Sequence, residues 1–474
     1  MNVNYDLKKM LELQDFSSIK DKILDILLKN MITNSNHIDF YTSNRANFVE
    51  KLYKITGVRA SFSFRRINHN FPNIYRAGIS FEYLGVKLSA GAAEYGSKSK
   101  KILEIKAIGE FLERFSARLP LDELIKNKYD IKKIKDNYPA EIKINSILNR
   151  ESILVKRNRV YYGFKNEDRF IDSEYNIDKY YHPTTNGCAG HFNKDKAVIS
   201  AWLEIVQRDG FLVYWLNSVS PKHISVKECI SKQDIGKRVC GEACQDIKNL
   251  LEEIDRYNLK CYLLDITSDI NIPNICCVIE DGVNGGKKIG MGASSGFNIE
   301  DNILNSMTEA LSVFSSNYNK EAFPLDKNYK PFVDGKIGQS ERLSFYLSNK
   351  NYEYFKFFIN NKNSVSLENW ASCSGAFNSN SLRNNTTAQL KYLKNIFVER
   401  CEYNSDYNVF VYEFKNKVLK AFDYKSVRVI CRALYSLYLN ENYADVNHPR
   451  LKEFIKNKNL ENEAKLNIWP HPFP

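Results

Sequence analysis

Three segments share one helical pattern, and this pattern limits the fold more than any other feature of the sequence. Residues 100–119, 196–211 and 300–316 alternate apolar and polar positions with the period of an amphipathic helix. Their apolar faces carry Ile108, Phe111, Leu112 and Phe115; Val198, Trp202, Ile205 and Val206; and Ile303, Met307, Leu311 and Phe314. The pattern predicts three helices that each bury one face.

The opposite face of each predicted helix has a glutamate at its middle position. The polar positions are Lys106, Glu110 and Glu113; Ser200, Glu204 and Gln207; and Asn305, Glu309 and Ser312, with Arg114 and Arg208 at the edges. Carboxylates that converge in a cleft repel one another unless cations lie between them, and oxygen-only sites suit Mg²⁺ with nucleotide phosphates. The pattern is compatible with such a cleft, and also with three ordinary surface helices.

The remaining sequence predicts three regions. Residues 1–60 have helical periodicity, residues 61–335 mix strand-like runs with the three helices, and residues 336–474 are richer in lysine, asparagine and tyrosine. We therefore expect a helical N-terminal segment, a mixed α/β core and a separate C-terminal lobe. The runs near 61–95, 153–171, 259–267 and 274–282 are the expected strands, the lysine-rich segment 126–150 is an expected surface loop, and the glycine-rich stretch after 282 is an expected hairpin turn.

Composition excludes several classes of protein. The 474 residues contain no apolar run of about 20 residues, which a membrane helix needs, and the first residues lack a signal-peptide layout. We expect a cytoplasmic protein. The net charge of +12 is dispersed along the chain, so neither nucleic acid nor a membrane is an expected partner. Cys240 and Cys244 lack further zinc ligands, and the ten cysteines are expected to be reduced thiols.

No standard nucleotide-binding or hydrolase motif is present. The sequence lacks GxxxxGK[ST], GxGxxG, HExxH, GxSxG and the kinase motifs. If the protein uses ATP, it uses none of those folds.

The sequence ends on NIWPHPFP, in which proline alternates with other residues. Proline restricts φ and donates no backbone hydrogen bond, so this segment is expected to be a stiff, extended rod. A rod of this kind suits placement in a site, although an exposed tail has the same composition.

The longest motif resembles the central signature of the YcaO family. It reads TTNGCAGHFNKDKAVISAWLEIVQRDGFLVYWL, while AIGEFLERFSA and NILNSMTEALSVFSS resemble the first and third helices of that family, in the same order. The resemblance implies an ATP-dependent enzyme that activates a peptide backbone amide. It also implies a mixed α/β fold that holds ATP and Mg²⁺ between its helices.

The resemblance assigns roles by position. Glu110, Glu113 and Glu204 would be Mg²⁺ ligands, and the nucleotide-binding set would be Lys106, Glu110, Glu113, Arg114, Asn186, Ser200, Glu204, Gln207, Arg208 and Glu309. Two positions depart from the pattern, because Lys106 replaces a usual serine and Asn305 replaces a usual arginine. Losing a guanidinium removes a bidentate phosphate contact.

The proline tail selects one branch of the family. A terminal PxPxP is similar to the end of the azoline-forming cyclodehydratase (D-protein) subunits of microcin-type synthetases. The implied reaction converts Cys, Ser or Thr of a ribosomal precursor peptide into thiazoline or oxazoline, after phosphorylation of the backbone amide oxygen. The Pro474 carboxylate is the implied catalytic group, with His471 and His191 as alternatives.

The same branch implies partners and leaves alternatives open. An E1-like partner would bind the leader peptide of the precursor, an FMN-dependent dehydrogenase would oxidise azoline to azole, and a homodimer within a complex is one expected arrangement. The alternatives are a non-catalytic YcaO-like scaffold subunit, and an enzyme that forms thioamide or amidine.

Overall fold

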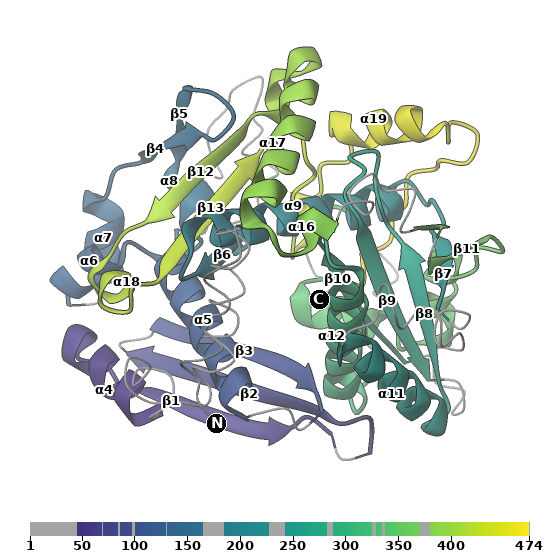
Figure 1. Ribbon diagram of the computed structural model, residues 1–474, viewed down its shortest axis with the longest axis horizontal. Helices are drawn as coiled ribbons and strands as arrows, with labels where there is room; N and C mark the ends of the chain where they lie inside the picture. Colours follow the sequence, from purple (N-terminus) through teal and green to yellow (C-terminus); the bar gives the residue numbers. More distant parts are fainter. Residues whose placement is uncertain are drawn as a thin grey trace, which may run out of the picture.

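Three β-sheets form the framework of the described residues (Figure 1). The computed structural model describes residues 45–68, 70–83, 86–96, 100–128, 130–164, 184–226, 242–281, 288–324, 329–333, 337–367, 369–370 and 380–473. The result is a mixed α/β fold, as the sequence predicts. Of the expected N-terminal helical segment, only α4 (Arg45–Thr56) lies within the described residues.

The first sheet is an antiparallel meander of β1 (Ala60–Arg66), β2 (Ile74–Tyr83) and β3 (Val86–Tyr95). Its strands confirm the expectation for residues 61–95. One face of the sheet packs against α5 (Lys100–Arg118), the first of the three predicted helices. The predicted apolar face of α5 is buried, because Phe111 and Leu112 are inaccessible and Ile108 and Phe115 are nearly so.

The second sheet joins residues that are far apart in the sequence. Its order is β5 (Ser152–Lys156), β4 (Glu141–Ser146), β12 (Val409–Phe414), β13 (Lys425–Cys431) and β6 (Cys188–His191). The expected surface loop at 126–150 is wrong, since it contains α7 (Ile131–Asn137) and β4. In β4 the apolar residues Ile142 and Ile144 point inward between exposed residues, and the neighbouring lysines conceal this alternation.

This sheet also corrects the expected C-terminal lobe. Strands β12 and β13 lie between β4 and β6, so residues 336–474 do not form a separate lobe. Local composition cannot reveal such pairing, because the partner strands are more than 200 residues away. The boundary at residue 60 stays a prediction.

The third sheet has the order β10 (Ile289–Ser295), β9 (Asn274–Asp281), β8 (Leu259–Asp265), β7 (Lys222–Ser225) and β11 (Ser364–Ser366). Strands β8, β9 and β10 are antiparallel, which confirms the expected strands and the hairpin. Helix α12 (Ile299–Asn317) packs on β9 and β10, with α11 (Glu242–Arg256) beside it. The predicted apolar faces of α12 and of the helix expected at residues 196–211 are buried.

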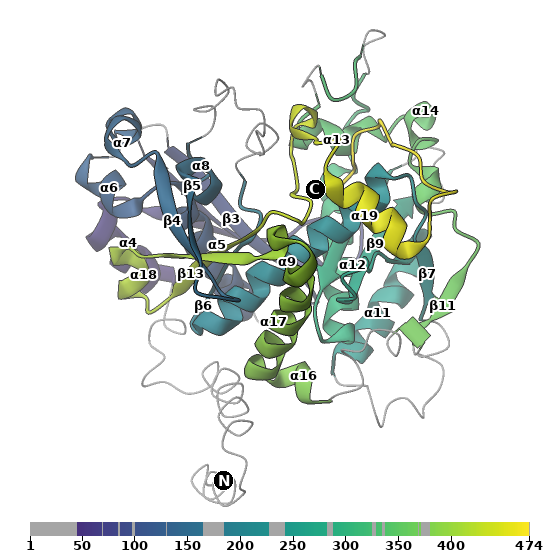
Figure 2. The same cartoon turned by 90° about the horizontal axis from the view of Figure 1, so that it is seen from above.

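Helix α9 (Lys194–Leu216) lies between the second and third sheets (Figures 1 and 2). It begins at Asn193, whose side chain accepts a hydrogen bond from the Lys196 amide at 3.0 Å. Helices α17 (Thr386–Tyr403) and α19 (Pro449–Lys458) pack against it. The shorter helices are α6 (Leu121–Lys126), α8 (Arg157–Val160), α13 (Gln339–Phe345), α14 (Asn349–Tyr352), α16 (Asn380–Asn384) and α18 (Lys417–Ala421).

The proline tail is buried in the protein up to Phe473. His471 and Phe473 are inaccessible to solvent, and Phe473 belongs to the apolar core around the second half of α9. An exposed tail is therefore excluded for residues 470–473. In the described part of the chain, no helix has the length and apolar character needed to cross a membrane.

Candidate functional site

Glutamates from the three predicted helices converge. Glu113 on α5 has a pKa well above its ordinary value because burial, and then repulsion from Glu204 and Glu110, disfavour its charge. The pKa of Glu309 on α12 is raised by burial, and Glu204 and Glu110 contribute in the same direction. Repulsion between carboxylates is large enough to raise a pKa only when they lie close together. The carboxylates of α5, α9 and α12 therefore share one cluster.

Main-chain amides orient two of these carboxylates. The Gly187 amide donates to Glu204 Oε2 at 3.0 Å, and the Ala293 amide donates to Glu309 Oε2 at 2.9 Å. Gly187 has a φ of +75°, and a Cβ there would lie 2.4 Å from the Val429 carbonyl oxygen. Only glycine suits this turn. The NG of the TTNGCAGH motif thus delivers an amide hydrogen to the second helix.

Arginines partly neutralise the cluster. Arg114 lies 2.6 Å from Glu110, and Arg208 lies 3.5 Å from Glu204. The Arg208 Nε and Nη1 atoms are buried and have no hydrogen-bond partner among the residues that the structure describes, and the same holds for Asn186 Oδ1. A buried polar atom without a hydrogen bond is energetically costly. Each of these atoms could still form a hydrogen bond with a ligand. Guanidinium donors are suited to phosphate oxygens.

Arg428 belongs to this cluster, although the sequence analysis does not identify it. It is 1% exposed on β13, and its Nη2 donates to the Thr184 carbonyl. Its charge opposes the rise in pKa of Glu113 and Glu204, which burial causes. A single arginine in the strand KSVRVIC carries no motif. Only the pairing of β13 with β6 brings it to the carboxylates.

Four predicted polar residues lie away from the cluster or are already engaged. Lys106 is exposed and forms an ion pair with Glu94 at 2.8 Å. Ser200 is exposed one turn before Glu204, and Asn305 is exposed on α12. Gln207 is nearly buried and donates to the Ala293 carbonyl at 2.6 Å, so its amide nitrogen holds α9 to β10.

The remaining predictions concern Pro474, the cysteines and His191. Pro474 and Cys240 lie outside the described residues. His191 accepts a hydrogen bond from the Asn193 amide at 2.9 Å, which is a turn contact at the start of α9. The cysteines whose side chains are described are free thiols.

The cluster fits a Mg²⁺-nucleotide better than a protein-only metal site. In the described residues, no group of three or more His, Cys, Asp and Glu side chains could enclose a metal ion. Mg²⁺ commonly takes one or two carboxylates and completes its shell with phosphate oxygens and water. Repelling carboxylates with raised pKa values beside unpaired arginine donors match that requirement.

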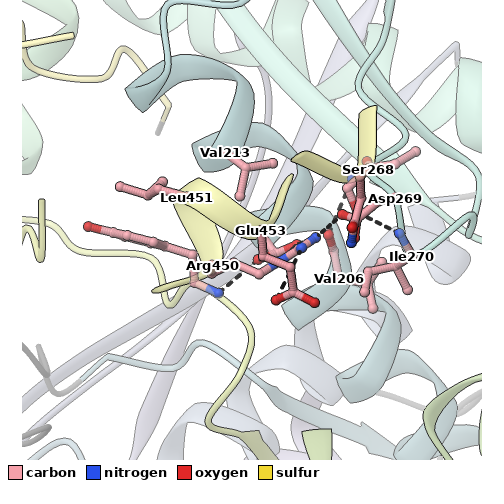
Figure 3. Close-up of polar contacts among 12 residues, drawn as sticks. Val206, Val213, Ser268, Asp269, Ile270, Arg450, Leu451 and Glu453 are labelled. Carbon is pink, nitrogen blue, oxygen red and sulfur yellow. Dashed lines mark hydrogen bonds and ion pairs between the residues drawn. The ribbon is translucent and has the colours of Figure 1, made fainter. Parts of the chain in front are cut away.

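A second charged cluster begins one residue further along α9, at Asp209, and Figure 3 shows Arg450 and Asp269 of this cluster. Arg450 of α19 lies 2.9 Å from Asp209 and 2.5 Å from Asp269, and all three side chains are buried. Asn457 donates to Asp269 at 2.7 Å, and Arg400 lies 3.3 Å from it. Burial alone would raise the pKa of Asp269, but Arg450 and the other donors lower it to about 2. This cluster anchors α19 to α9.

Solved structures share the fold. A heterocyclase in complex with substrate and cofactor matches with a TM-score of 0.59 and 14% identity over 91% of this chain. The chain spans only 57% of that heterocyclase. YcaO from Methanopyrus kandleri, bound with AMPPCP and Mg²⁺, matches with a TM-score of 0.51 and 15% identity, over 84% of this chain and 90% of that one. At these identities the likeness concerns the fold alone.

A third match is weaker. The E. coli microcin synthetase McbBCD complex with pro-MccB17 has a TM-score of 0.48 and 16% identity, over 88% of this chain and 96% of that one, which is too distant to carry an argument. No curated protein matches the sequence significantly. The family described as YcaO cyclodehydratase, ATP- and Mg²⁺-binding, matches residues 141–431. Because this match spans more than half of the chain, the protein belongs to the YcaO family.

Proposed function

We propose that the chain is an ATP-dependent cyclodehydratase that converts Cys, Ser or Thr of a ribosomal precursor peptide into thiazoline or oxazoline. The observation that carries this proposal is the cluster of carboxylates from α5, α9 and α12 with unpaired arginine donors beside it. The family's ATP and Mg²⁺ chemistry supports it. The reaction phosphorylates the backbone amide oxygen of the peptide.

The residues of the cluster have separate roles in this proposal. Glu110, Glu113 and Glu204 would contribute ligands to Mg²⁺ together with phosphate oxygens of the nucleotide, and the ion would supply positive charge beside the transferring phosphoryl group. The free N–H groups of Arg208 bind phosphate oxygens, and Asn186 Oδ1 accepts from the nucleotide. Arg428 touches Thr184 and lowers the repulsion between the carboxylates before the ligand binds.

The buried tail supports the azoline-forming branch. Residues 470–473 lie beside α9 and reach Arg208, since the guanidinium of Arg208 is 4.4 Å from the centre of the Phe473 ring. That the Pro474 carboxylate transfers a proton stays a prediction. Extension of the chain after Pro474 by a short tag tests it, because turnover should then fall more than nucleotide affinity.

The proposed partners follow from the same branch. They are the precursor peptide, an E1-like protein that binds its leader, and an FMN-dependent dehydrogenase acting after ring formation. A heterocyclase in complex with substrate and cofactor shares the fold of this chain.

The test is turnover of a cognate precursor peptide in the presence of the leader-binding partner, Mg²⁺ and ATP. We expect ADP release and loss of one water per ring, read by mass spectrometry. ADP release with exchange of oxygen for sulfur, or with amidine formation, would move the chain to another branch of the family. Absence of both signals with an active partner would refute enzymatic activity.

A scaffold subunit is the second candidate function. It is favoured by Lys106, which is paired with Glu94, and by the exposed Asn305 at the position of a usual arginine. A scaffold would leave turnover unchanged when Glu113 is replaced in the assembled complex, whereas the enzyme would lose it.

A further inference from the structure

The tail runs backwards along α9, from the end of that helix toward the carboxylate cluster. The Asn467 amide donates to the Leu216 carbonyl at 2.8 Å, close to the last turn of α9. Further on, Trp215 Nε1 donates to the Trp469 carbonyl at 3.1 Å. The contacts on the tail advance in sequence while those on α9 recede. The segment 465–473 is therefore aligned with the helix that carries Glu204.

Arg342 of α13 holds the tail at His471. Both side chains are inaccessible, and Arg342 Nη1 lies 2.6 Å from His471 Nε2 and 3.2 Å from Nδ1. The same Nη1 donates to the Tyr438 carbonyl at 2.9 Å, and that carbonyl lies 2.8 Å from His471 Nε2. The Tyr438 carbonyl only accepts and arginine only donates, so a neutral imidazole that donates from Nε2 to the carbonyl accepts from Arg342 at Nδ1. Tyr346 also donates its hydroxyl hydrogen to the Pro470 carbonyl.

Phe473 connects this contact to the cluster. Its ring centre is 4.8 Å from that of Phe211 and 4.4 Å from the Arg208 guanidinium. The ring covers one side of the guanidinium and Glu204 pairs with Nη2, while Nε and Nη1 have no hydrogen-bond partner in the described part of the chain. An aromatic ring under an arginine restricts the plane of the guanidinium and so directs its free donors.

We propose that Arg342 is a positioning residue, which clamps the tail through His471 and thereby holds Phe473 against Arg208. This inference rests on the proposed function, because Arg208 is taken as a nucleotide contact. Arg342 itself touches neither Arg208 nor the carboxylates through any hydrogen bond or ion pair in the described residues. The charges of Arg342 and Arg208 do repel each other, so Arg342→Lys, which keeps the charge, separates this direct electrostatic effect from one that passes through the tail.

The experiment compares three variants of the full chain. Arg342→Met removes the clamp, Arg342→Lys keeps a cationic donor, and Arg157→Met is the matched control. Arg157 likewise donates to main-chain carbonyls, those of Lys135 and Tyr138, but lies on α8, away from the tail. Hydrogen–deuterium exchange of residues 465–473 reports the tail, and calorimetric titration with Mg²⁺-AMPPCP reports the site.

We expect Arg342→Met to speed exchange in the tail and to weaken AMPPCP binding about tenfold, the factor that a buried cation–π contact is worth. Arg342→Lys should recover part of both effects. Arg157→Met should change neither, even where it lowers the melting temperature. These three results together support the clamp.

Two results would overturn it. Unchanged tail exchange in Arg342→Met would mean that Arg342 does not hold the tail. Faster exchange with unchanged AMPPCP affinity would mean that the tail does not position Arg208. If the unmodified chain binds no nucleotide, the proposed function fails, and the exchange measurement alone then decides whether Arg342 holds the tail.

Discussion

Arg208 and Asp209 are neighbours on α9, yet they belong to two charged clusters of opposite character. Around Asp209, Arg450 pairs with two carboxylates, and Asn457 and Arg400 complete the contacts of Asp269. Around Arg208, carboxylates from three helices outnumber their cations, and guanidinium donors are unpaired. In the first cluster, which we call closed, both carboxylates pair with Arg450, although Arg450 Nη1 makes no hydrogen bond within the described residues and lies 3.9 Å from Glu453. In the second, which we call open, the described carboxylates lack such a set of paired cations. The proposed nucleotide site lies on the side of α9 where the described carboxylates have raised pKa values.

Breaking the closed cluster should produce the largest effect. Replacement of Arg450 by methionine leaves Asp209 and Asp269 buried without their main cation. We expect the free energy of unfolding to fall by about 3–5 kcal/mol, measured by denaturant titration. The control is Arg432→Met, because Arg432 is 39% exposed and lies 4.0 Å from Asp406, where a loss under about 1 kcal/mol is expected. Equal losses in both variants would contradict the difference between the clusters.

The open cluster should respond in the opposite way. Replacement of Glu113 by glutamine removes a charge that burial, Glu204 and Glu110 disfavour, so the free energy of unfolding should not fall. ADP release should nevertheless drop about 100-fold, since a ligand of the transition-state charge is lost. Glu123→Gln on α6 is the control for both measurements. A large stability loss with full turnover would reverse the assignment of Glu113.

The raised pKa values predict a pH dependence of the ligand-free protein. A carboxyl with a raised folded pKa contributes stability that is fully present below its unfolded pKa and is lost as the pH rises through the folded pKa. Burial raises the pKa of four carboxyl groups, so each makes the protein less stable as the pH rises. They are Glu113, Glu204, Glu309 and Glu441, and the pKa of Glu441 is raised to about 8.

The measurement is the melting temperature between about pH 6.5 and 8, with and without Mg²⁺-AMPPCP. Buried histidines oppose the slope at the lower end of this window and buried cysteines add to it at the upper end, so the difference between the two conditions isolates the cluster. We expect the melting temperature to fall with rising pH in the ligand-free protein. Mg²⁺-AMPPCP should flatten the slope by neutralising the cluster, and Glu441→Gln should remove the share of Glu441, which lies outside the cluster. An equal slope with and without Mg²⁺-AMPPCP would contradict the ligand dependence of the cluster.

Lys106 should have the smallest effect. Its ion pair with Glu94 is half-exposed, with the two side chains 48% and 25% accessible. Lys106→Ala should therefore change the free energy of unfolding by less than about 1 kcal/mol. Because Lys106 is engaged outside the cluster, AMPPCP affinity should change less than about threefold, a difference under 1 kcal/mol. A tenfold loss of affinity would instead place Lys106 on the nucleotide, as its position in the first helix predicts.

Helical periodicity was sufficient to find the three helices and their buried faces. The positions of Phe111, Trp202 and Met307 in the core follow from the spacing of apolar residues alone. The same spacing put Glu113, Glu204 and Glu309 on faces able to meet. Periodicity assigns a residue to a face of its own helix, and the predicted convergence needed the family resemblance in addition.

Long-range pairing accounts for what the sequence did not reveal. Arg428 reaches the cluster through β13, whose neighbours in the sheet are β12 and β6. The spacing of Gln207 predicts a ligand contact, but its side-chain amide donates to the Ala293 carbonyl of β10. The proline content predicts a stiff, extended tail, but it does not predict which residues bury His471. Those residues come from α13 and from the loop after β13. No local pattern encodes these neighbours.

The alignment of the tail with α9 has a consequence for insertions and deletions. The Asn467 amide is bonded at one end, the Phe473 ring rests on Arg208 at the other, and Pro470 and Pro472 lie in the segment between. An extended proline-rich chain advances about 3.1 Å per residue and has little capacity to contract. One residue more or fewer would carry the ring past the guanidinium. The number of residues in this segment therefore has to match the distance between the end of α9 and Arg208.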